Sequence, residues 1–134
     1  MPNSILIPVA LDQDTLVPGK LATARTMLEP GGQITLLCVL ESVPGYASEF
    51  VTVKSENHLT DKVSAQLDAL KDGNDVHIMV TSGKPGIRIA EVAEEIGADL
   101  VIVGARQPGA LDIFLGSTAA RVARRAPCSV LIQR

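Results

Sequence analysis

The chain has few aromatic residues, few cysteines and no excess of basic residues. Of its 134 residues, one is tyrosine, two are phenylalanine and none is tryptophan, so a core must be built mostly from aliphatic side chains, as in buried parallel strands. The two cysteines, Cys38 and Cys128, lie inside apolar segments, which indicates small hydrophobic residues in a reducing compartment. The formal net charge of -3 argues against nonspecific nucleic-acid binding.

Long hydrophobic runs are missing as well. No segment approaches the roughly 18 consecutive apolar residues that a membrane-spanning helix needs. The N-terminus lacks the basic start, the hydrophobic stretch and the cleavage site of a signal peptide. We therefore expect a soluble, cytoplasmic protein without a membrane partner, with one domain over residues 1–134.

Short apolar runs alternate with amphipathic segments. Hydrophobic periodicity predicts strands at Ser4 to Ala10, Ile34 to Leu40, Val76 to Thr81, Leu100 to Val103 and Ser129 to Gln133. It predicts helices at about Leu16 to Glu29, His58 to Lys71, Ile87 to Ile96 and Ser117 to Arg125, with one long loop at Glu41 to Glu56. This alternation predicts an α/β fold, a single-domain doubly wound, five-stranded parallel sheet with helices on both faces.

One strand-to-helix junction is the best candidate for a binding site. An apolar run ends at Gly104, a turn-rich loop follows, and Gly116-Ser117-Thr118 precedes a helical segment. Glycines let the backbone approach a ligand, and the N–H groups of a helix's first turn favour an anion. From Val101 onward there are five arginines against one aspartate, so this part of an otherwise acidic chain attracts anions. The junction therefore predicts phosphate binding.

Three segments together resemble the universal stress protein family over nearly the whole chain. They are Ile-Leu-Ile-Pro-Val near the start, Gly-Ala-Asp-Leu-Val-Ile-Val-Gly, and the ending from Leu-Gly-Ser-Thr to Pro-Cys-Ser-Val-Leu-Ile. The ATP-binding branch of that family has Gly-x-x-Gly followed, after a spacer, by Gly-Ser or Gly-Thr. Here Gln107 replaces the second glycine, and the loop is similar to a Gly-x-Arg-x-Pro subgroup. The resemblance implies an adenine nucleotide alpha hydrolase-like, Rossmann-like three-layer sandwich.

The resemblance also implies a ligand, which is ATP with or without Mg²⁺, bound by a stress-response sensor or switch. The residues that it places around the nucleotide are Pro8, Val9, Val39 and Gly83 near the nucleoside, and Gly104, Arg106, Gly116, Ser117 and Thr118 around ribose and phosphates. Ala10 stands where the family has an aspartate that contacts the nucleoside. Chemically, Ser117 can cap its helix or donate to a phosphate, and Arg106 offers a planar fork of donors.

Other readings remain open. Dedicated catalysis is not required, although Ser117 and Thr118 are the nearest hydroxyls for slow ATP hydrolysis or autophosphorylation. A different alternative is a protein–protein interaction module without nucleotide affinity, acting on an unknown client through its dimer surface and the loop at Glu41 to Glu56. The resemblance implies a homodimer paired through Ser129 to Gln133.

Three further kinds of site have candidate residues in the sequence: a metal site, a P-loop and a pair of acidic ligands. His58 and His77 have no local set of metal ligands, so no metal site is predicted. Gly83-Lys84-Pro85 lacks both the upstream glycine and the following Ser or Thr of a P-loop. Asp12 and Asp14 could bind magnesium or a ribose, or could simply complement the charge at a helix start.

Overall fold

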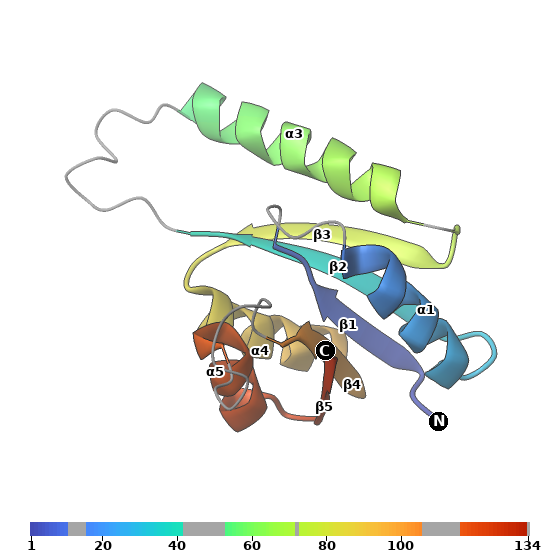
Figure 1. Ribbon diagram of the computed structural model, residues 1–134. Helices are drawn as coiled ribbons and strands as arrows, with labels where there is room; N and C mark the ends of the chain where they lie inside the picture. Colours follow the sequence, from blue (N-terminus) through green and yellow to red (C-terminus); the bar gives the residue numbers. More distant parts are fainter. Residues whose placement is uncertain (11–15, 42–52, 72, 106–115, 134) are drawn as a thin grey trace.

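Five parallel strands form one sheet, and helices cover both of its faces (Figure 1). The computed structural model describes residues 1–10, 16–41, 53–71, 73–105 and 116–133. The strands are β1 (Ser4–Pro8), β2 (Gln33–Leu40), β3 (Val76–Ser82), β4 (Leu100–Gly104) and β5 (Ser129–Gln133), in the order β3-β2-β1-β4-β5. The predicted fold class is confirmed.

The described helices are α1 (Val17–Met27), α3 (Val53–Leu70), α4 (Pro85–Ile96) and α5 (Ser117–Arg125). The prediction of a loop through Glu56 is wrong for its last residues, because α3 already begins at Val53. The first residues of α3, Val-Lys-Ser-Glu-Asn, contain a single apolar side chain, so periodicity gives no helical signal there. Residues 42–52 of the predicted loop lie outside the described part of the chain.

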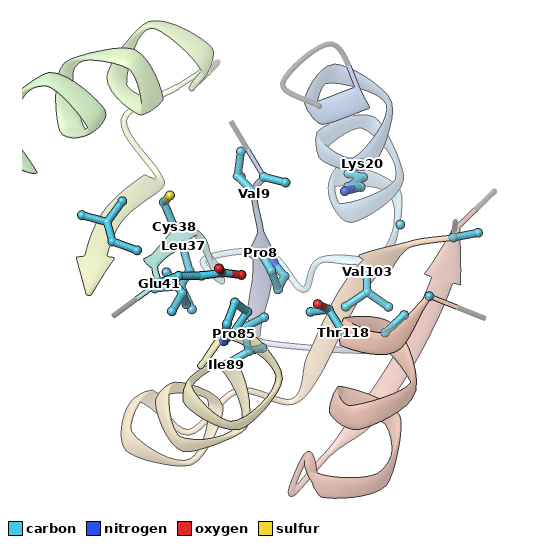
Figure 2. Close-up of a pocket in the computed structure, with 17 residues that line it drawn as sticks. Pro8, Val9, Lys20, Leu37, Cys38, Glu41, Pro85, Ile89, Val103 and Thr118 are labelled. Carbon is cyan, nitrogen blue, oxygen red and sulfur yellow. The ribbon is translucent and has the colours of Figure 1, made fainter. Parts of the chain in front are cut away.

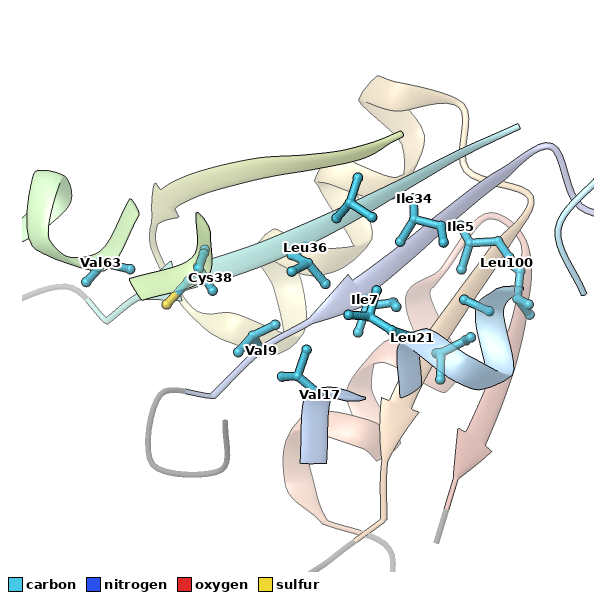
Figure 3. Packing of buried hydrophobic residues seen from close by; sticks show 14 residues of the cluster. Ile5, Ile7, Val9, Val17, Leu21, Ile34, Leu36, Cys38, Val63 and Leu100 are labelled. Carbon is cyan, nitrogen blue, oxygen red and sulfur yellow. The ribbon is translucent and has the colours of Figure 1, made fainter. Parts of the chain in front are cut away.

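Two hydrophobic clusters lie on opposite faces of the sheet. In β1, Ile5 and Ile7 point to one face and Leu6 to the other, as the alternation of side chains in a strand requires. The first cluster includes residues of α1 and α3 and is shown in Figure 3. The second includes residues of α4 and α5. The sheet is therefore buried on both sides, which accounts for the continuous apolar runs in the sequence.

The order of the strands reverses beside β1. The chain passes from β1 to β2 and β3 in one direction across the sheet, and then places β4 and β5 on the other side of β1. In such folds the crevice beyond the carboxyl ends of the strands at this reversal is the usual ligand site. Here those ends are Pro8 in β1 and Gly104 in β4.

Local contacts fix the opposite ends of these two strands. Gly97 ends α4 in the left-handed conformation, with φ 66°, and its N–H donates to carbonyls of the preceding turn. Asp99, just before β4, accepts hydrogen bonds at Oδ2 from the backbone N–H groups of Asn3 and Ser4, at 3.0 and 3.1 Å. The start of β1 is thereby tied to the start of β4.

The sheet has β3 at one edge and β5 at the other. In β5, Val130 and Leu131 are half-buried, and Ile132 is 37% exposed. Within the described residues, no helix has both the length and the apolar character needed to cross a membrane.

Candidate functional site

A cavity of about 740 Å³ lies at the carboxyl ends of the central strands (Figure 2). Its volume is within the range of roughly 300–1,000 Å³ that is usual for small-molecule sites. Its walls come from β1, β2 and β4, from the start of α4, from α1 and from the start of α5. The described residues around it are Pro8, Val9, Ala10, Lys20, Leu37, Cys38, Val39, Leu40, Glu41, Pro85, Ile89, Val103, Gly104, Ala105, Gly116, Thr118 and Ala119.

Most residues that the sequence predicts for a nucleotide site come together at this cavity. Those that line it are Pro8, Val9, Ala10, Val39, Gly104, Gly116 and Thr118. Gly83 and Ser117 are described but are not among its lining residues. Arg106 lies outside the described residues, as do Gln107, Asp12 and Asp14.

Gly83 lies in the turn between β3 and α4, and Ser117 lies at the start of α5. Gly83 has φ +140°, a conformation that side chains rarely adopt, and its N–H donates to the carbonyl of Leu40 at 2.9 Å. Of the two roles that the sequence leaves open for Ser117, capping the helix is not the one found, because the N-cap is Gly116 and no side-chain hydrogen bond caps the helix. Ser117 is the first helical residue, and its side chain is exposed, so its hydroxyl can still donate to a ligand.

The cavity has an apolar part and a polar part. Val9 and Val39 provide an apolar surface at the cavity wall that suits a flat aromatic group, and Val39 packs against the cluster that contains the fully buried Leu37. On the other side, Gly116 leads into α5 with φ -60° and ψ 152°. The N–H groups of a helix's first turn have no acceptor within the helix, so this wall offers donors to an anion.

Sequence reasoning missed Lys20, which lines the cavity from α1. Lys20 is only 7% exposed, and a Cβ atom added to Gly104 would lie 3.1 Å from the Lys20 Nζ. The ammonium group therefore lies directly against the backbone of Gly104. A signal was present in the sequence: Lys20 shares the helical stripe of Val17, Leu21 and Ala24, which is otherwise apolar and buried.

Burial lowers the pKa of the Lys20 ammonium from its ordinary value of 10.5, because desolvation disfavours the charged form. In the pH window between the lowered pKa and 10.5, the unfolded chain binds more protons than the folded protein. Burial of the charge therefore lowers the free energy of unfolding by its full amount at pH values below this window. The free energy of unfolding recovers as the pH rises through the window.

Lys20→Met should consequently stabilise the free protein at pH 7, by about 1 kcal/mol, because methionine keeps an apolar stem and removes the buried charge. The advantage over the wild type should shrink near pH 10. Urea unfolding of both proteins at the two pH values measures this difference in the free energy of unfolding. Lys62 is exposed, so Lys62→Met is the control for the loss of a surface charge. A Lys20→Met protein less stable than the wild type at pH 7 would contradict the assigned cost.

Besides Lys20 and Thr118, two more polar side chains border the cavity, Cys38 and Glu41. Burial raises the pKa of the Cys38 thiol, so it stays protonated at neutral pH and is a poor nucleophile. Glu41, just after β2, is exposed. The described part of the cavity therefore favours binding through its backbone, its apolar surface and Lys20 over covalent chemistry.

Comparisons with known proteins, by family model, by sequence and by structure, point to one family. The model of the universal stress protein family matches residues 1–134. Universal stress protein G of Shigella flexneri is 30% identical over 145 aligned positions, covering 100% of both chains. The solved structure of the hypothetical protein MJ0577 superposes with a TM-score of 0.77 at 24% identity, over 98% of this chain and 96% of that one. A universal stress protein in complex with cAMP gives a TM-score of 0.64 at 19% identity, covering 99% and 97%.

Proposed function

The chain belongs to the universal stress protein family, and we propose that it binds an adenine nucleotide, ATP, in the cavity beside β1 and β4 as a stress-response sensor or switch. The observation that carries the proposal is the meeting of an apolar surface with a helix start and glycine backbone in one cavity of about 740 Å³. The fold supports it, because this cavity lies where the strand order reverses.

The two parts of the cavity suit the two parts of a nucleotide. The base would pack on the apolar surface of Val9 and Val39, which excludes water from its faces. The phosphates would lie toward Gly104, Gly116 and Thr118, where backbone N–H groups and a hydroxyl can donate. A related fold has been solved with cAMP, so an adenine nucleotide is a reasonable ligand for this architecture.

Binding alone is sufficient for a sensor. A ligand shifts an equilibrium between two folded conformations by as much as its affinities for them differ, and such a shift can change the availability of a surface to a client. As part of the same proposal, the protein forms a homodimer by pairing of β5, which is an edge strand with an exposed isoleucine.

Calorimetric titration of the wild-type protein with ATP, ADP, AMP and cAMP, with and without Mg²⁺, tests the proposal. We expect saturable binding of ATP, and weaker binding of UTP, which offers a smaller base to the apolar surface. Flat heats for every adenine nucleotide would reject nucleotide binding and favour the alternative of an interaction module without a ligand.

A further inference from the structure

Lys20 is the one basic side chain among the described residues that line the cavity. It lies on the α1 side, whereas Thr118 lies on the α5 side, and Pro8 and Val103 lie between them (Figure 2). The cation thus faces the same crevice as the start of α5, but from a different helix. Within the described parts of the chain, no carboxylate forms an ion pair with it.

We propose that the Lys20 ammonium binds a phosphate group of the nucleotide beside Gly104, so that the cavity selects phosphorylated ligands over nucleosides. This inference rests on the proposed function and adds a residue and a selectivity to it. A phosphate reached by Lys20 from α1 and by backbone donors from α5 is held from two sides.

The position of the ammonium supports this role. Nζ would lie 3.1 Å, and Cε 3.3 Å, from a Cβ at position 104, so the glycine leaves room for the lysine head. A lysine that only covered apolar surface with its stem would extend its charged end into water. Here the residue is 7% exposed and its end lies at the cavity wall. A bound anion would offset part of the cost of removing the charge from bulk water.

Lys20→Met tests the inference by calorimetry with ATP, ADP and adenosine. We expect ATP affinity to fall about 30-fold, the size expected for losing a hydrogen bond to a charged group, while adenosine affinity stays within about threefold. Lys62→Met removes an equal charge from an exposed position on α3 and should leave ATP affinity unchanged. Circular dichroism and thermal unfolding establish that each variant is folded.

The possible failures are distinguishable. If the wild type binds no nucleotide, the proposed function fails and this inference fails with it. If the wild type binds ATP and Lys20→Met binds it equally well, only the role of Lys20 is overturned. Equal losses for adenosine and ATP would also overturn it, because they would indicate a structural effect on the whole cavity.

Gly104→Ala provides a second, independent test of the placement. The added methyl would lie 3.1 Å from Nζ, and the flexible lysine end must move away to accommodate it. In a double-mutant cycle, Gly104→Ala should weaken ATP binding in the wild type by about tenfold and by less than about threefold in Lys20→Met. Equal losses in both backgrounds would mean that the methyl blocks the ligand directly, and would overturn the placement of a phosphate beside Lys20.

Discussion

Gly116→Val should weaken ATP binding by about 100-fold or more, equivalent to about 2.8 kcal/mol of binding free energy. Gly116 lines the cavity with backbone atoms alone and precedes the first turn of α5. A branched side chain at this position would take space at the cavity wall and shield the N–H groups that the phosphates need. Calorimetric titration of the variant with ATP measures the loss.

The fold should survive this substitution. The backbone at Gly116 has φ -60° and ψ 152°, which is an ordinary extended conformation for valine. Ala123→Val places the same side chain on an exposed position of the same helix and should leave ATP affinity unchanged. Wild-type affinity in Gly116→Val would place the nucleotide away from the start of α5.

The sequence predicts α5 and β5 with the bounds that the structure has, and α4 to within two residues. These elements are bounded by residues that end a helix or strand, such as Gly97, which follows α4 in the left-handed conformation. The start of α3 is not predictable in the same way, because a mostly polar first turn has no hydrophobic period. The strand order is not encoded locally either, since it depends on which side of β1 each crossover returns to.

The candidate site was predictable where backbone and strand ends form it. Pro8, Val39 and Gly104 end or nearly end their strands, and parallel strands bring such positions to one edge. Lys20 was not found because a lysine in a helix is expected on the solvated face. Its burial depends on tertiary packing, in which α1 covers the sheet beside the end of β4.

The core and the cavity share Leu37, so stability and binding should respond together to its truncation. Leu37→Ala should lower the free energy of unfolding by about 3 kcal/mol and Tm by about 10 °C, because the side chain is 0% exposed and belongs to the cluster under α4 and α5. Thermal and urea unfolding measure both quantities. Leu59→Ala makes the same chemical change at a residue of α3 that is 48% exposed, and should stay within about 0.5 kcal/mol of the wild type.

Adding ATP to these unfolding experiments separates the two roles of Leu37. A ligand at 100 times its Kd stabilises the folded state by about 2.7 kcal/mol, and the wild type and Leu59→Ala should both gain this amount. Leu37→Ala should gain less at the same ATP concentration, because Val39 of the cavity wall packs against the cluster that holds the buried Leu37, and a void there would loosen the surface that the base contacts. An equal gain in all three proteins would mean that the cavity wall keeps its shape without Leu37, and that this side chain supports the sheet without affecting binding.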